Sequence, residues 1–200
     1  MQESIRVSPM RRRVLQAGLA LSASAVAWPR CVGAAANAAV PLTPACDDGD
    51  DPTPSQTAGP FYTPNSPERA SLNEPGITGV PIVLTGLVLT RDCRPVPGAL
   101  LDFWHADDAG AYDNDGYRLR GHQHADDTGR YRLETIVPGL YPGRTRHFHV
   151  RAQAPSGPIL TTQLYFPDEP QNQRDRFFRP DLLMSQDDGM ARFDFVLESS

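Results

Sequence analysis

The sequence predicts an all-β fold: a single antiparallel β-sandwich with a long irregular N-terminal segment and few short helices. After Val80 the chain breaks into at least six short stretches rich in β-branched and aromatic residues, with Gly, Pro and Asp turns between them. No stretch carries the sustained apolar period of an amphipathic helix. Several short strands without intervening helices are typical of a sandwich.

Each expected strand follows from its own pattern. Residues 81–90 and 129–136 alternate apolar and polar side chains, and residues 99–105 end in an apolar run at Trp104. We expect turns over residues 91–97 and at Arg120-Gly121, and one short helix over residues 170–178. The expected strands are residues 81–90, 99–105, 129–136, 147–153, 160–166 and 191–197.

Residues 1–38 have the features of an export signal. Arg11, Arg12 and Arg13 precede a short, weakly apolar run, and small residues of the A-x-A type end near Ala38. The run is too short to span a membrane. Paired arginines before an apolar dipeptide resemble a twin-arginine signal, with a plain secretory signal as the alternative. We therefore expect an exported protein, periplasmic or extracellular.

The remaining chain divides by composition into two parts. Residues 39–79 are rich in Pro and Asp and are expected to wrap the surface, whereas residues 80–200 are expected to form the catalytic sandwich. The net charge is -5, although residues 1–38 are basic. An acidic body without a basic patch argues against a nucleic-acid partner, and we expect no membrane association of the mature form.

Two cysteines, Cys46 and Cys93, remain after removal of the expected signal. An even pair in an oxidising compartment predicts a disulfide between them. Neither lies near the histidines discussed next, so we assign both a structural role.

The stretch from Tyr141 to His149 concentrates metal-binding side chains. On a strand, the two-residue period places His147 and His149 on one face. Such a pair is compatible with an ordinary polar sheet face and equally with a metal site. Tyr141 and, upstream, Tyr112 favour the metal, because tyrosinate binds hard, highly charged cations. Two phenolates favour Fe(III) over zinc, which prefers Cys and His.

Several patches, taken together in order and spacing, resemble the intradiol ring-cleavage dioxygenases over roughly residues 53–197. They are residues 53–62 (TPSQTAGPFY), 102–112 (DFWHADDAGAY), 119–121 (LRG), 129–141, 147–149 (HFH) and 162–166 (TQLYF). This resemblance implies a non-haem Fe(III) site with Tyr112, Tyr141, His147 and His149 as ligands. It also implies catalytic roles for Arg144, Gln163 and Tyr141, which can leave the metal to act as a base.

The activity implied by the resemblance is cleavage of a small aromatic diol by O2 between its two hydroxylated carbons, giving a muconate-type diacid. We expect His105, His122 and His124 to be solvated or supporting histidines, because the four-ligand set is already full. No helical dimerisation region precedes the expected sandwich, so the chain is closer to protocatechuate-type subunits or secreted members, and a homo-oligomer is compatible with it.

Two other functions are compatible with parts of the pattern. A non-catalytic sandwich that binds small phenolics would share the scaffold with a decayed metal site, but all four expected ligands are present. A zinc hydrolase would use the histidine pair, but it leaves Tyr112 and Tyr141 unexplained, and no general base is evident beside the pair.

Overall fold

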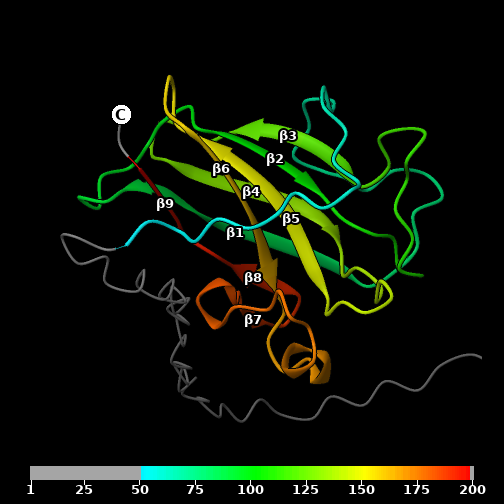
Figure 1. Ribbon diagram of the computed structural model, residues 1–200. Helices are drawn as coiled ribbons and strands as arrows, with labels where there is room; N and C mark the ends of the chain where they lie inside the picture. Colours follow the sequence, from blue (N-terminus) through cyan, green and yellow to red (C-terminus); the bar gives the residue numbers. More distant parts are fainter. Residues whose placement is uncertain (1–50, 199–200) are drawn as a thin grey trace, which may run out of the picture. The chain divides into compact units, whose positions relative to one another are not determined.

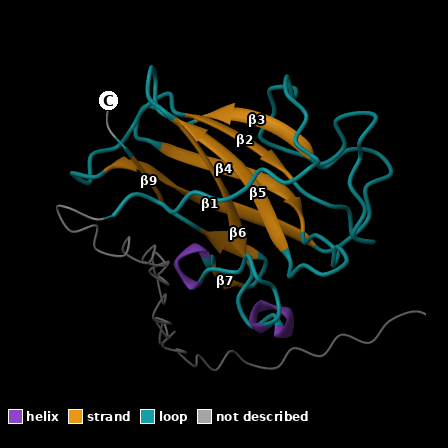
Figure 2. Cartoon of the chain, in the orientation of Figure 1, coloured by secondary structure: helices purple, strands orange, loops and turns teal. Residues whose placement is uncertain are grey.

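The computed structural model describes residues 51–198, which contain nine strands and two short 3-10 helices (Figures 1 and 2). The strands are β1 (Pro81–Thr90), β2 (Leu100–Trp104), β3 (Arg120–His124), β4 (Arg130–Ile136), β5 (His147–Gln153), β6 (Ile159–Tyr165), β7 (Ser185–Asp187), β8 (Met190–Arg192) and β9 (Phe195–Leu197). The helices are η1 (Pro170–Gln173) and η2 (Pro180–Leu182). The expected all-β class is confirmed.

The strands form two sheets around one apolar core. One sheet has the order β4-β1-β8-β7 with β9 also paired to β1, and the other has the order β3-β2-β5-β6. Leu84 of β1 and Leu133 of β4 share one buried cluster with Phe103 of β2 and with Phe148 and Val150 of β5. Burial of side chains from both sheets in this cluster is the main stabilising contribution to the sandwich.

The C-terminal strand differs from the prediction. Residues 191–197 form two short strands, β8 and β9, and both pair with β1 in parallel. The break lies where the chain crosses Gly86: a Cβ atom there would come within 1.8 Å of the Phe193 carbonyl oxygen. The Asp194 carboxylate replaces one ladder bond by accepting from the Leu87 amide at 2.8 Å. Glycine is therefore required at this close approach.

Strand β3 was not predicted, and its residues 120–124 were expected to begin with a turn. The sequence RGHQH has no apolar alternation, so the pattern gave no strand signal. Pairing with β2 on one edge and with residues 67–69 on the other makes it a strand, as the Arg69 amide bonds to the His122 carbonyl at 2.8 Å. The expected helix over residues 170–178 is only the short helix η1 followed by a turn.

Residues 51–79, here called the lead segment, lie along the outer edges of the sheets (Figure 1, cyan). They form isolated β-bridges but no strand. The Gln56 amide bonds to the Thr161 carbonyl of β6 at 2.7 Å, and the Leu72 amide bonds to the Glu134 carbonyl of β4 at 2.8 Å. Leu72 is itself 0% exposed within the core. The segment therefore covers edge backbone groups that would otherwise be unpaired.

Several predictions concern residues 1–50, which lie outside the described residues. These are the export signal, the start of the wrapping segment and Cys46. Cys93 is disulfide-bonded, and its pairing with Cys46 stays a prediction. Within residues 51–198 no helix combines the length and the apolar character needed to cross a membrane.

Leu72→Ala tests whether the lead segment is part of the folded core. We expect a loss of about 2–5 kcal/mol in the free energy of unfolding, measured by urea denaturation, because a fully buried side chain is replaced by a cavity. Val80→Ala is the control, since Val80 is 67% exposed and its truncation should change stability by less than about 0.5 kcal/mol. Equal small losses in both variants would contradict this role.

Candidate metal centre

The site is built on the face of sheet β3-β2-β5-β6 that points away from the core, here called the outer face. Strand β5 is buried on both sides: Phe148 and Val150 enter the core, whereas His147 and His149 occupy the outer face. The lead segment covers this face, which explains why polar side chains on it are buried. The expected alternation along this strand is confirmed by these positions.

One row of cross-strand neighbours carries the centre of the site. Arg120 of β3 lies opposite Trp104 of β2, Trp104 lies opposite His149 of β5, and His149 lies opposite Gln163 of β6. All four side chains belong to residues that are at most 2% exposed. We call these four residues the site row. Directly paired residues share a sheet face, so the row is fixed by strand register.

The two histidines converge through their Nε2 atoms, which are 3.1 Å apart. His147 Nδ1 donates its proton to the Thr145 carbonyl oxygen at 2.7 Å. The free lone pair of the neutral ring is therefore on Nε2. The Tyr112 hydroxyl lies 3.2 Å from the same Nε2 atom. Three potential donor atoms therefore meet at one point of the outer face.

Burial sets the charge of these groups. Desolvation, with the nearby Arg144 cation, lowers the pKa of His147 to about 4, and burial also lowers the pKa of His149 well below its usual range. Both imidazoles are therefore neutral at physiological pH. Burial raises the pKa of Tyr112, against the opposing effects of Arg144 and Arg120. A phenol in that position ionises when a cation replaces its proton.

Aromatic packing holds the donors in place. Trp104 stacks on His149 with ring centroids 4.9 Å apart and an interplanar angle of 5°. Phe61 stacks on Tyr112 at 4.5 Å and meets the edge of Tyr141 at 5.4 Å. The sequence patches contained Trp104 and Phe61 but no pattern assigned them these contacts.

A pocket of about 430 Å³ opens onto this cluster. Its walls are residues Thr57, Gly59, Pro60, Phe61, Tyr112, Tyr141, Arg144, His147, His149, Arg176 and Phe177. The lead segment therefore forms one wall, as Gly59 shows: a Cβ atom there would lie 3.3 Å from His149 Cε1. Gly59 also has φ of 66°, which favours glycine.

Arg144 and Gln163 are brought together behind the pocket. Arg144 donates from Nε to Asp175 Oδ2 at 2.8 Å and from Nη2 to Gln163 Oε1 at 2.5 Å. Gln163 is 0% exposed and donates to the Thr57 carbonyl at 2.9 Å, so Arg144 lines the pocket while Gln163 supports it. Asp175 had no recognisable sequence signal, because its pairing with Arg144 joins residues 31 positions apart.

The side chains at this position suit a hard metal ion such as Fe(III) better than they suit zinc. Among residues 51–198 no group of three or more His, Cys, Asp or Glu side chains could hold a metal. A site here would thus need Tyr112 and Tyr141 beside the histidines, and phenolate oxygens with neutral imidazoles suit Fe(III). The fit rests on the facing Nε2 atoms, whose convergence a shared cation would stabilise.

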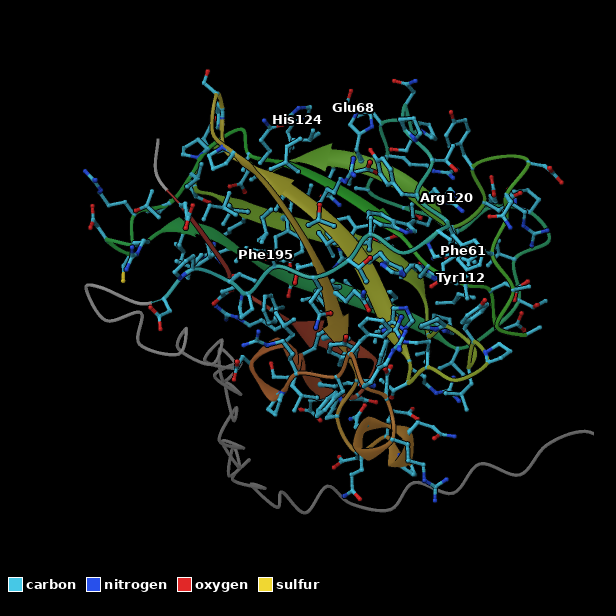
Figure 3. The ribbon with its side chains drawn as sticks, in the orientation of Figure 1. Phe61, Glu68, Tyr112, Arg120, His124 and Phe195 are labelled. Carbon is cyan, nitrogen blue, oxygen red and sulfur yellow. The ribbon has the colours of Figure 1, made fainter. Side chains whose placement is uncertain are left out.

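The other histidines lie apart from the pocket. His105 is 1% exposed, with its ring nitrogens 2.7 Å from the Ala106 carbonyl oxygen and 2.7 Å from Thr135 Oγ1, and burial lowers its pKa to about 4. It is thus a buried, hydrogen-bonded residue. His122 and His124 share the outer face of β3, where His124 lies 3.5 Å from the Glu68 carboxylate (Figure 3).

Comparison with known proteins identifies the family of the chain. A family model described as Dioxygenase matches residues 57–198. The solved dioxygenase domain of a novel dioxygenase carbohydrate-binding protein fusion from Streptomyces sp. SirexAA-E is 54% identical, covers 75% of this chain and 100% of that one, and has a TM-score of 0.73. Catechol 1,2-dioxygenase of Candida albicans is 31% identical over 154 residues, 63% of this chain and 51% of the relative.

The beta chain of protocatechuate 3,4-dioxygenase from Burkholderia cepacia is 32% identical over 133 residues, 58% of this chain and 57% of the relative. The chain belongs to the intradiol ring-cleavage dioxygenase family. It spans about half the length of the curated relatives it matches.

Asp175→Asn tests the pair that holds Arg144. Burial alone would raise the pKa of Asp175, but hydrogen bonds from the Phe177 and Thr145 amides and from Arg144 hold it below the ordinary 3.8. We expect the free energy of unfolding at neutral pH to fall by on the order of 3 kcal/mol, because Arg144 loses its counter-charge.

The pH dependence of this loss follows from the sign of the shift. A depressed folded pKa means that the wild-type stabilisation is full above the ordinary carboxyl value and disappears as pH falls through the folded value. Urea titrations should therefore show the gap between wild type and Asp175→Asn closing below about pH 3. A gap that stays constant down to acid pH would contradict the ion pair.

Proposed function

We propose that the chain is a non-haem Fe(III)-dependent intradiol dioxygenase. Tyr112, Tyr141, His147 and His149 would hold the iron. The observation that carries this proposal is the meeting of His147 Nε2, His149 Nε2 and the Tyr112 hydroxyl within 3.1–3.2 Å in a pocket that Tyr141 also lines. Membership of the family supports it, and the coordination set suits a ferric ion.

The proposed substrate is a catecholic aromatic that is cleaved by O2 between its two hydroxylated carbons to a muconate-type diacid. Bound iron would supply a Lewis acid that holds both substrate oxygens and makes the ring reactive towards O2. Relatives named for catechol and protocatechuate support this class of substrate. The aromatic wall of Phe61, Tyr112 and Phe177 suits a planar ring.

Tyr141 is the proposed base. A catechol must lose its hydroxyl protons to bind as an anion, and we propose that Tyr141, which would hold the metal as a phenolate, accepts one of them at Oη and becomes a neutral tyrosine. Within the described residues this oxygen makes no hydrogen bond, unlike the Tyr112 hydroxyl. Tyr141 begins a turn whose next residues, Pro142 and Gly143, are exposed. This phenol is therefore less constrained than Tyr112, as a group that leaves its position must be.

Arg144 is the proposed source of fixed positive charge. Negative charge develops on the substrate during oxygen attack, and a preorganised cation beside it lowers the barrier. Arg144 uses Nε and Nη2 on Asp175 and Gln163, while Nη1 makes no hydrogen bond within residues 51–198. We assign Gln163 to holding this guanidinium through Oε1. The cation is thus oriented before substrate arrives.

A visible spectrum with an iron assay tests the proposed function. Tyrosinate bound to Fe(III) gives an intense red-brown absorption, so the purified protein should be coloured, contain iron and consume O2 with a catechol. Tyr112→Phe and Tyr141→Phe should each shift or weaken the band, because each removes one phenolate.

Tyr131→Phe is the matched control. Its hydroxyl donates to the Phe193 carbonyl at 2.8 Å in the core, and burial raises its pKa well above the ordinary value, so it stays a phenol outside the ligand set. Its spectrum should equal that of the wild type. A colourless, iron-free wild type, or equal changes in all three variants, would contradict the proposal.

We also propose that the enzyme is exported, periplasmic or extracellular, by the twin-arginine pathway. The arginines before an apolar dipeptide and the small residues near Ala38 support this. That pathway carries folded proteins, which suits a protein that binds its metal before export. A disulfide at Cys93 also suits an oxidising compartment.

Changing Arg12 and Arg13 together to lysine should retain the protein in the cytoplasm, because the paired arginines are the proposed recognition element. Cell fractionation followed by immunoblotting measures the outcome, and Arg6→Lys is the control, since it lies outside the pair. Unchanged export of the double variant would instead favour a plain secretory signal.

A further inference from the structure

Arg120, the first residue of β3, is a buried cation to which neither the sequence analysis nor the proposed chemistry assigns a role. It is 2% exposed, and burial lowers the pKa of its guanidinium. Within the described residues it forms no ion pair at hydrogen-bond distance; its partners are two backbone carbonyl groups. Nε and Nη2 donate to the Asp113 carbonyl at 3.0 and 2.6 Å, and Nη1 donates to the Phe61 carbonyl at 2.5 Å.

Burial of this cation among neutral partners destabilises the fold, so its presence indicates that the geometry it imposes is needed. A buried charge is destabilising without a counter-charge, and neutral carbonyl groups compensate it only through good hydrogen bonds. The planar guanidinium fork can hold two acceptors in fixed directions, which an ammonium group on a flexible stem cannot do. The position therefore favours a residue that ties two backbone segments together.

The two segments meet on either side of one proposed ligand. Asp113 directly follows Tyr112 in the chain, and Phe61 stacks on the Tyr112 ring at 4.5 Å with an interplanar angle of 21°. Figure 3 shows Phe61, Tyr112 and Arg120 close together at one end of the sheet. One guanidinium thus fixes the backbone beside the phenol and the aromatic ring that packs on it.

The Arg120 guanidinium with its bonds to the Asp113 and Phe61 carbonyl groups, here called the clamp, is itself supported by the sheet. Arg120 lies opposite Trp104 in the site row, and Trp104 stacks on His149. A second arginine, Arg69 of the lead segment, donates to the Arg120 carbonyl from Nε at 2.9 Å and from Nη2 at 2.7 Å. The main chain of Arg120 is therefore anchored on a strand that is itself held at both edges.

The loop after Tyr112 is ordered from inside as well. The Asp113 carboxylate accepts from the amides of Gly116 and Arg118, each at 2.9 Å. Its carbonyl remains available to Arg120. Near Tyr141 the corresponding bond is more remote: Arg146 Nη1 donates to the Pro138 carbonyl at 2.5 Å, three residues before Tyr141, which sits on a turn beside exposed residues. The two tyrosines of the proposed site therefore differ in how firmly the fold holds them.

We propose that Arg120 is a positioning residue that holds Tyr112 in place through the Asp113 and Phe61 carbonyl groups, so that Tyr112 stays a ligand while Tyr141 is the tyrosine free to leave. This inference rests on the proposed function. It assigns the different behaviour of the two phenols to the bonds from Arg120 to the residue directly after Tyr112, because Phe61 itself packs on both rings.

Arg120→Lys and Arg120→Met test the clamp by two independent readouts. Lysine keeps the charge but loses the fork, whereas methionine keeps most of the apolar stem and loses all donors. In the iron-loaded protein we expect the tyrosinate band to shift, and kcat to fall about tenfold or more, since misplacement of a reacting group has large effects on rate. KM should change less, and Lys should lie between Met and wild type.

Hydrogen exchange on the iron-free protein is the second readout. Amides of residues 58, 59, 61, 62 and 111–115 should exchange about tenfold faster in Arg120→Lys than in wild type, because local opening is easier without the fork. Val88→Ala is the control: it removes packing from a 0% exposed core position of β1 and should leave the band and these local rates unchanged.

The outcomes separate the two proposals. Unchanged exchange in both segments together with a wild-type spectrum and kcat in Arg120→Lys would overturn the clamp, even if the melting temperature falls. A colourless, iron-free wild type would overturn the proposed function. Faster local exchange in Arg120→Lys would in that case still support the clamp on the Tyr112 loop. If Arg120→Met does not fold, Arg120→Lys alone decides the question.

Discussion

The whole site depends on strand β5 being buried on both of its faces. Phe148 and Val150 hold the strand in the core between the two sheets, and the same two-residue period places His147 and His149 on the outer face. The positions of these two proposed ligands are thus fixed by the packing that stabilises the sandwich. A one-residue slip of register would move both histidines into the core, so core packing and site geometry are a single constraint.

Burial of the outer face comes from the lead segment. Its residues supply a wall of the pocket and cover the edges of β6 and β3. Removal of water from this face keeps both histidines neutral and leaves Tyr112 needing a cation to ionise. The same segment carries Phe61, and through it the lead segment reaches Arg120. The proposed chemistry therefore relies on a stretch with almost no regular secondary structure.

The parts of the fold that local patterns encode were predictable. The all-β class, most strands and the common face of His147 and His149 follow from alternation and turn residues. Strand β3 did not follow, because RGHQH becomes a strand only through its neighbours. The parallel pairing of β8 and β9 depends on Gly86 meeting Phe193. Asp175 pairs with the side chain of Arg144, 31 residues away, and Arg120 donates to the carbonyl groups of Asp113 and Phe61, 7 and 59 residues away. Neither role could be read from a local sequence pattern.

In the proposed site, two imidazoles from β5 and two phenols from neighbouring loops hold one ferric ion. Anomalous diffraction at the iron absorption edge, from crystals of the protein as purified, tests it most directly. We expect one strong peak per chain, in contact with His147 Nε2, His149 Nε2 and the hydroxyl oxygens of Tyr112 and Tyr141. A peak at another position, contact with only the two histidines, or no iron peak in an active protein would contradict the account.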